Sequence, residues 1–246
     1  MTTIQCRDIK FEHIEAIIFD KDGTLEDSED FLRLLGHKRS RIIDARVPGI
    51  GDPLLMAFGL TDNTLDPTGL LAVGSRGENE IAAAAYIAET GRGWLDALEI
   101  ARAAFDEADE FFKKNATPSP LFVGCLEAII YLSQAGLKLG ILSAASTERV
   151  QAFAQHYQID TYLQLQMGVD SGPSKPDPAL FLQACQSLGV EPGVTLMVGD
   201  SPADFQMAKR AGAAGCIGIS WRPASSDRLA GADVAIASLD EILIQS

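Results

Sequence analysis

The pattern of apolar and polar positions is most regular from about residue 120 onward, where short apolar runs alternate with segments of helical spacing. The helical spacing predicts helices at residues 124–134, 147–156, 178–188 and 202–211. The apolar runs predict short strands at residues 137–143, 162–167, 194–198, 216–219 and 234–236. This alternation is typical of a parallel sheet built from right-handed βαβ units.

A further apolar run, Ala16–Phe19, lies more than a hundred residues before these units. Because all four positions are apolar, the run predicts a strand covered on both faces within the same parallel sheet. After it come segments rich in Ala, Glu, Leu and Ile, notably 79–89 and 94–113, which favour helices. Stretches rich in Pro and Gly, at 47–53 and 66–69, separate such segments.

These patterns together predict an α/β fold with two parts. Residues 1–25 and 116–246 are expected to form a Rossmann-like parallel sheet flanked by helices. Residues 26–115 are expected to form a small α-helical domain, inserted after the first strand. We expect its hinges near residues 25–30 and 114–120.

Composition narrows the classes of function. The chain has 246 residues, 47% of them hydrophobic, which supports a folded core, and no apolar run reaches the ~18 residues of a membrane span. The start of the chain lacks the basic and apolar regions of a signal peptide, so we expect a cytoplasmic protein without a membrane partner. The cysteines form no CxxC pair and the histidines no ligand-spaced set, so no zinc cluster is indicated. The oligomeric state stays open.

The net charge of −14 disfavours a nucleic-acid partner, because phosphate backbones are bound mainly by clustered Lys and Arg. A small anionic substrate is compatible with this charge if the protein provides a local positive site. A metal ion held by carboxylates is one such site.

The first candidate for chemistry follows the run Ala16–Phe19 directly, as Asp20-Lys21-Asp22-Gly23-Thr24. Strand side chains alternate between faces, so Asp20 and Asp22 can project to the same side just beyond the strand end. Open α/β sheets bind their ligands at that edge. Gly23 marks a sharp exit from the strand. Two aspartates in a capped turn are the alternative interpretation.

Three further candidates follow later apolar runs. Ser143 and Ala144 occupy a strand-to-helix turn that can bind an anion, while Ser146 is also a common helix N-cap. Lys175 precedes a helix that starts with proline, and by itself could be a solvated surface charge. Asp200 and Asp204 follow the run 194–198, and could also belong to a capped turn.

In this order, the four elements resemble the haloacid dehalogenase superfamily of hydrolases, and the resemblance covers the whole chain. Motif one matches Asp20-Lys21-Asp22-Gly23-Thr24, motif two Ser143, motif three Lys175 and motif four Gly199-Asp200-Ser201-Pro202-Ala203-Asp204. The position of the insert resembles the subgroup of phosphoglycolate phosphatase and β-phosphoglucomutase, which carries a helical cap there.

The resemblance implies a Mg²⁺-dependent phosphatase acting on a monoester of a small phosphorylated metabolite, such as phosphoglycolate or a sugar phosphate. Asp20 is the expected nucleophile, ionised at pH 7 by its reference pKa near 4, and forms an aspartyl-phosphate. Asp22 is the expected proton donor, which later activates water. Asp20, Asp200 and the backbone carbonyl of Asp22 are the expected Mg²⁺ ligands. Asp204 binds the metal directly, binds it through water, or orients Asp200.

The same resemblance assigns the residues that bind the substrate. Lys175 supplies positive charge between nucleophile and phosphate, and Ser143 and the Ala144 N–H bind phosphoryl oxygens. Thr24 of motif one is assigned to substrate binding as well.

The family motifs assign no role to two further basic residues, Lys21 and Arg76. Lys21 is expected to face the cap or solvent, with a direct role in substrate binding left open. Arg76, in an apparent loop flanked by Gly74 and Gly77, is the candidate for binding the non-phosphate end of the substrate, with a surface arginine as the alternative.

Other functions stay open at this stage. A sugar-phosphate mutase uses the same aspartyl-phosphate and the same motifs. A 2-haloacid dehalogenase is disfavoured, because Asp22 is present and a halide leaving group needs no proton. A non-catalytic sensor of a phosphorylated ligand is disfavoured by the intact set of acidic residues and Lys175.

Overall fold

The computed structural model describes residues 2–115, 118–221 and 226–245. The chain divides into two compact units, Met1–Asp27 with Pro120–Ser246, and Ser28–Ser119. The sequence predicts the two domain boundaries at 25/26 and 115/116, a few residues earlier than the structure places them. Ala116 and Thr117, within the second expected hinge, lie outside the described residues.

The first unit contains a six-stranded parallel sheet with the strand order β10-β9-β8-β3-β6-β7. Its strands are β3 (Ala16–Phe19), β6 (Lys138–Leu142), β7 (Leu165–Met167), β8 (Thr195–Gly199), β9 (Gly215–Ile219) and β10 (Val234–Ile236). The predicted α/β class with a parallel sheet is therefore confirmed. The strand expected at 162–167 starts only at Leu165, because a short 3-10 turn, Asp160–Tyr162, comes first.

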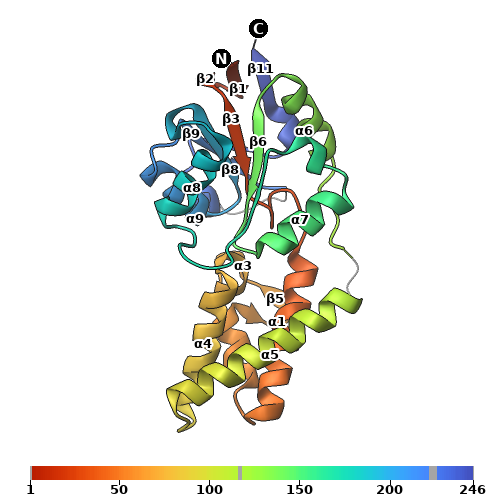
Figure 1. Cartoon of the computed structure of the whole chain (residues 1–246), viewed down its shortest axis with the longest axis vertical. Coiled ribbons are helices and arrows are strands. Elements are labelled where there is room, and N and C mark those ends of the chain that lie inside the picture. The colour runs from red at the N-terminus through yellow and green to blue at the C-terminus, as the bar shows by residue number, and fades with distance from the viewer. Residues whose placement is uncertain (1, 116–117, 222–225, 246) are drawn as a thin grey trace. The chain divides into compact units, whose positions relative to one another are not determined.

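Helices cover both faces of this sheet (Figure 1). Ile17 and Phe19 of β3 pack into a core with α6 (Cys125–Gln134) and α7 (Thr147–His156). Their neighbours Ala16 and Ile18 join a core with α8 (Pro178–Leu188) and α9 (Pro202–Arg210) on the opposite face. This alternation explains why the whole strand is apolar, since successive side chains enter different cores.

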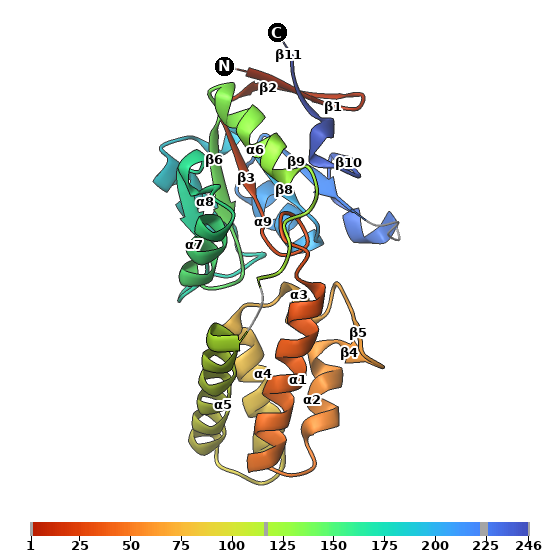
Figure 2. The same cartoon turned by 90° about the vertical axis from the view of Figure 1, so that its right-hand side faces the viewer.

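The α/β unit also has a three-stranded antiparallel sheet that the sequence pattern did not predict. Its order is β11-β1-β2, with β1 (Thr2–Cys6), β2 (Ile9–Ile14) and β11 (Ile242–Gln245). Thr3 pairs with Gln245, so the two ends of the chain lie side by side (Figure 2). The strand Ala16–Phe19 is therefore the first of the parallel sheet but the third of the chain. Further 3-10 turns lie at Pro192–Val194, Ser226–Leu229 and Leu239–Glu241.

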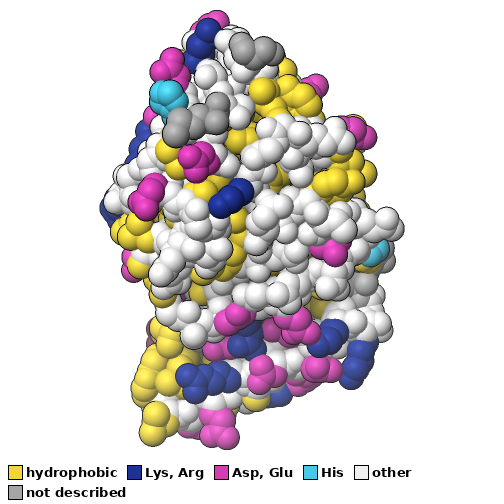
Figure 3. All heavy atoms as spheres, turned by 45° about the horizontal axis from the view of Figure 1, so that its top comes forward, with side chains coloured by type: hydrophobic (Ala, Val, Ile, Leu, Met, Phe, Trp, Pro, Cys, Tyr) yellow, Lys and Arg dark blue, Asp and Glu magenta, His cyan; other side chains and the backbone are white. Residues whose placement is uncertain are grey.

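The second unit is mainly helical, as predicted. It contains α1 (Glu29–Arg46), α2 (Gly51–Phe58), α3 (Leu70–Val73), α4 (Arg76–Glu89) and α5 (Trp94–Asn115). A small hairpin of β4 (Leu60–Thr61) and β5 (Thr64–Leu65) interrupts them, which corrects the expectation of a purely helical insert. Small buried alanines of α4 and α5 let these helices pack closely around Phe58 and Phe105. Acidic and basic side chains are mixed on the face of this unit in Figure 3.

The chain leaves and re-enters the α/β unit through two adjacent segments. The Asp27 N–H donates to the Pro120 carbonyl at 2.8 Å, and the Phe122 N–H donates to the Leu25 carbonyl at 2.9 Å. Glu26 and Leu121 form an antiparallel bridge between them. These bonds tie both crossings to the loop that follows β3. Across the described ranges, no helix is long and apolar enough to span a membrane.

Candidate active site

The sheet order brings the predicted motifs to one edge. β3 lies between β6 and β8, with Phe19 opposite both Ile141 and Val198. Because the three strands are parallel, the residues that follow them emerge at the same edge. Asp20 follows β3, Ser143 follows β6 and Asp200 follows β8. Of the later strands, β6 and β7 lie on one side of β3, and β8, β9 and β10 lie on the other. Open α/β sheets form their ligand sites at such a reversal of strand order.

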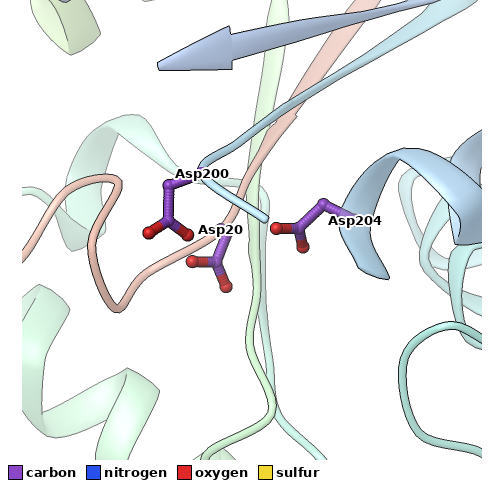
Figure 4. Close-up of side chains that lie close together, drawn as sticks. All are labelled: Asp20, Asp200 and Asp204. Carbon is purple, nitrogen blue, oxygen red and sulfur yellow. The ribbon is translucent and has the colours of Figure 1, made fainter. Parts of the chain in front are cut away.

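Three buried carboxylates converge at this edge: Asp20, Asp200 and Asp204. Each offers an oxygen within 4.8 Å of the oxygens of the others. Figure 4 shows the three side chains turned toward one another, with Asp204 reaching in from α9. The Asp20 N–H donates to the Val198 carbonyl at 2.8 Å, which holds the loop after β3 against the end of β8.

Two glycines make this close approach possible. Gly23 has φ +81°, and a Cβ there would lie 2.2 Å from Asp200 Oδ2. A Cβ on Gly199 would lie 2.6 Å from Asp204 Cγ. Any side chain at either position would therefore displace a carboxylate of the cluster, so both positions require glycine.

Lys175 lies between two of the carboxylates. Its Nζ is 2.5 Å from Asp20 Oδ1 and 2.6 Å from Asp204 Oδ1, and the residue is 6% exposed. The alternative of a solvated surface charge is therefore wrong. Asp204 Oδ2 accepts a hydrogen bond from the Ser201 hydroxyl at 2.7 Å, at the start of α9. The capped turn and the acidic site, which the sequence offered as alternatives, thus coexist in one residue.

Burial dominates the proton equilibria of this cluster. Desolvation is the largest effect on Asp20 and raises its pKa to about 7. Repulsion from Asp204 and Asp22 also raises this pKa, and the attraction of Lys175, which lowers it, does not compensate. Burial and Asp20 also raise the pKa of Asp200 well above its ordinary value. Burial favours the neutral form of Lys175, yet Asp20 and Asp204 outweigh it and raise the pKa of Lys175. The reference pKa near 4 is therefore too low for Asp20 in the metal-free protein.

The donor set is compatible with a divalent metal ion. The carboxylates provide only oxygen ligands, which hard cations prefer, and lie in a buried place that disfavours unbalanced negative charge. A cation bound there would lower the pKa values that burial has raised.

Arg228 is a member of this site that the sequence reasoning missed. Its Nη2 pairs with the Asp200 carboxylate, and its Nε donates to the Asp200 carbonyl at 3.1 Å. Arg228 comes from the 3-10 turn Ser226–Leu229, well after motif four. Nothing in its spacing relates it to Asp200, so only the fold reveals the contact.

Asp22 lies beside this cluster with different partners. Its Oδ1 is 2.8 Å from Lys21 Nζ, and its Oδ2 accepts a hydrogen bond from the Ser143 hydroxyl at 3.4 Å. Lys21 also pairs with Glu26 and is 1% exposed. The expectation that Lys21 faces the cap or solvent is therefore wrong. The loop folds back so that the Gly23 N–H donates to the Glu26 carbonyl, and this brings the Glu26 carboxylate to Lys21.

The residues expected to bind phosphoryl oxygens are distributed around Asp22. Ser143 Oγ accepts the Ala145 N–H at 3.1 Å, and Ala144 occupies the half-buried turn between them. Thr24 is fully buried, and its hydroxyl has no hydrogen-bond partner among the described residues. Ser146 caps α7 by accepting the Arg149 N–H, as its alternative role predicted.

Arg76 belongs to the helical unit and does not lie in a loop. It is the first residue of α4, whose N-terminus is formed by Ser75 and Glu78 as a capping box. The Ser-x-x-Glu spacing was a signal for this helix start that the glycine-based interpretation overlooked. The guanidinium pairs with Glu80 and lies 2.6 Å from Asp106 and 2.9 Å from Asp109. These contacts link α4 to α5.

The model of the haloacid dehalogenase-like hydrolases matches residues 14–212. The chain belongs to this family. The match contains all four motifs and the helical insert, and the resemblance found in the sequence is confirmed.

Individual relatives agree with this membership. Phosphoglycolate phosphatase of Pseudomonas syringae is 28% identical over 217 residues, which cover 84% of this chain and 70% of the relative. A predicted phosphoglycolate phosphatase from Haemophilus somnus has a similar solved structure, with a TM-score of 0.69, 21% identity and coverage of 92% and 95% of the two chains. A putative β-phosphoglucomutase from Thermotoga maritima gives a TM-score of 0.60 at 19% identity, covering 93% and 96%.

Proposed function

We propose that this hydrolase removes phosphate from a small-molecule monoester, of the phosphoglycolate or sugar phosphate type, in a Mg²⁺-dependent reaction through an aspartyl-phosphate. The observation that carries the proposal is the pairing of Asp20 with Lys175 beside Asp200, with Asp22 two residues further along the same loop. The name of the Pseudomonas relative supports the substrate class.

In the first step, an Asp20 carboxylate oxygen attacks the phosphorus atom. A bond forms between that oxygen and phosphorus, and the bond from phosphorus to the ester oxygen breaks. Asp22 donates its proton to the departing oxygen, so the alcohol leaves neutral. The Ser143 hydroxyl, which already contacts Asp22, is placed to bind a phosphoryl oxygen beside this proton transfer.

In the second step, Asp22 is deprotonated and takes a proton from water. The water oxygen attacks the phosphorus of the aspartyl-phosphate, and the bond from phosphorus to Asp20 breaks. The Asp20 carboxylate and the protonated Asp22 are regenerated, and inorganic phosphate leaves. Over the two steps, the ester and one water molecule are consumed, and the alcohol and inorganic phosphate are released.

Charge is the main obstacle to the first step. A carboxylate that approaches a phosphate dianion to about 4 Å meets a repulsion on the order of 8 kcal/mol at an effective dielectric constant of about 20. Lys175 supplies one fixed positive charge at Asp20. Asp20, Asp200 and the Asp22 carbonyl would hold Mg²⁺, which supplies the remaining positive charge when bound. Asp204 holds Lys175 in place through its ion pair.

The helical unit, Ser28–Ser119, is proposed to act as the cap that selects the substrate. Its insertion directly after motif one supports this role. Thr24 and the Ala144 N–H are proposed to contact the phosphoryl group, and Arg76 the rest of the substrate.

The test is phosphate release from phosphoglycolate, sugar phosphates and nucleotides, each measured with and without Mg²⁺. We expect Mg²⁺-dependent release from at least one small ester. Asp20→Asn should reduce it by more than about a thousandfold, because the amide is not a nucleophile. Wild-type protein that releases no phosphate from any ester would contradict the proposal. Labelling of Asp20 without release would then indicate a mutase, and ligand binding without labelling a sensor.

A further inference from the structure

Lys21 is a buried cation to which the proposed reaction gives no task. It is 1% exposed, and it is the only lysine of motif one. Removing an ammonium group from water is costly, so a buried lysine needs partners that compensate for the loss of hydration. In this structure those partners are the carboxylates of Asp22 and Glu26.

The two oxygens of Asp22 have different neighbours. Oδ1 lies 2.8 Å from Lys21 Nζ, whereas Oδ2 lies 3.4 Å from the Ser143 hydroxyl. A carboxyl group can rotate about its Cβ–Cγ bond, so an unrestrained Asp22 would exchange the two oxygens. Lys21 distinguishes them and leaves Oδ2 on the side of Ser143.

Lys21 is itself held in place by its surroundings. Glu26 forms the second ion pair, and the ammonium lies 5.5 Å from the centre of the Phe153 ring of α7. The Lys21 carbonyl accepts the N–H groups of Leu25 and Glu26, both at 2.9 Å. Backbone and side chain are therefore both fixed, so the ammonium can act as a rigid reference point for Asp22.

We propose that Lys21 is a positioning residue for proton transfer, and that it holds Asp22 Oδ1 so that Oδ2 faces the leaving oxygen of the substrate. The inference rests on the proposed function, because it needs Asp22 as the acid. Lys21 contacts neither the substrate nor the reacting atoms. Its effect passes through the orientation of Asp22.

This role predicts a dependence on the leaving group. An alkyl phosphate needs a proton at its departing oxygen, whereas p-nitrophenolate leaves as an anion. The ratio kcat/KM reports only the steps up to departure of the alcohol, so later hydrolysis of the aspartyl-phosphate does not affect it. A fault in the orientation of Asp22 should therefore be visible as a selective loss for the alkyl ester.

The experiment measures kcat/KM for the best alkyl ester of the panel and for p-nitrophenyl phosphate. The variants are Lys21→Met, Asp22→Asn and the double variant. We expect Lys21→Met to lose about 10-fold to 100-fold on the alkyl ester and less than about threefold on the aryl ester, within the range of general acid catalysis. Once Asp22 is Asn, the second change should cost nothing further. Equal losses on both esters, or losses that multiply in the double variant, would overturn the inference.

Two more variants separate this role from a loss of folding. Lys209→Met is the matched control, because it removes a lysine from an exposed ion pair with Asp233 on the same unit, and it should change neither ester. Glu26→Gln keeps Lys21 and weakens its support, so a smaller loss confined to the alkyl ester is expected. If Lys21→Met does not fold, the result for Glu26→Gln decides. Equal fractional losses of kcat/KM on the two esters would then reject the role. Wild-type protein inactive on both esters would reject the proposed function itself.

Discussion

At the level of single residues, the site contains more buried carboxyl groups than basic side chains to pair with them. Asp20, Asp200 and Asp204 share two basic partners, Lys175 and Arg228. Each carboxylate is at least nine-tenths buried, so water screens their repulsion poorly. This repulsion is the physical reason why the metal-free site and the metal-bound site should differ in stability.

The pKa of Asp20 predicts a pH dependence for the metal-free protein. Its folded pKa, about 7, exceeds the ordinary value of 3.8, so the folded state retains the proton to higher pH than the unfolded state does. The stabilising contribution is complete below about pH 4 and is lost as the pH rises through 7. Urea unfolding in EDTA should therefore give a lower free energy at pH 8 than at pH 5.

Two comparisons test the cause of that dependence. Added Mg²⁺ should raise the free energy of unfolding at pH 8 more than at pH 5, because the ionised cluster binds it better. Asp20→Asn cannot ionise and should be less sensitive to pH, whereas the exposed control Asp240→Asn should behave as wild type. A flat profile for the wild-type protein in EDTA would show that the carboxylates are already compensated.

At the scale of elements, helix starts carry several of the key groups. Asp204 both caps the N-terminus of α9 and pairs with Lys175, so the same side chain stabilises the start of a helix and orders the site. Arg76 starts α4 and pairs with Asp106 and Asp109 of α5. These contacts give Arg76 a structural task within the helical unit, independent of any role toward a substrate.

Replacing Arg76 should therefore affect stability. Arg76→Ala removes three ion pairs around a half-buried guanidinium, and we expect a loss of about 1 to 2 kcal/mol, visible as a fall in Tm. Arg92→Ala, which removes one exposed pair with Asp96, is the control and should change Tm little. A raised KM for the small ester, with p-nitrophenyl phosphate unchanged, would support the substrate role as well. An unchanged Tm would contradict the structural role.

At the scale of the whole molecule, the two units have separate cores. The apolar cluster of the helical unit contains only residues from Leu35 to Ala108, and the clusters of the α/β unit contain none of these. Both chain crossings are tied to the α/β unit, where the Asp27 N–H meets the Pro120 carbonyl. The helical unit is thus attached as an insertion whose removal leaves two adjacent chain ends.

Excision of Ser28–Ser119 should give a folded core. With Asp27 joined to Pro120 through a short Gly-Ser linker, we expect cooperative thermal unfolding and retained Mg²⁺ binding, because the acidic cluster lies wholly in the α/β unit. Calorimetry measures both properties. Discrimination among esters should be lost if the helical unit is the cap. A molten or aggregated product would mean that the α/β unit depends on the helical unit for its stability.

The strands of the parallel sheet, the helices around it and the order of the motifs can be predicted from the sequence, whereas β1, β2, β4, β5 and β11 cannot. Periodicity reports which face of an element is buried, so β3, β6, β8 and the helices between them were predictable. The family resemblance assigns Asp20, Ser143 and Asp200 to one site, and the parallel pairing of β3 with β6 and β8 explains why they share an edge. Gly23 was recognised as a turn residue, although its contact with Asp200 was not.

The contacts between distant residues and the proton equilibria of the site arise only in the folded chain. The pairing of β1 with β11 joins residues more than two hundred positions apart, and local periodicity carries no information about such partners. The same holds for Arg228 on Asp200, and for the burial of Lys21 between Asp22 and Glu26. The pKa of Asp20 depends on every group packed around it. Desolvation is a property of the folded environment, and the type of residue alone does not fix it.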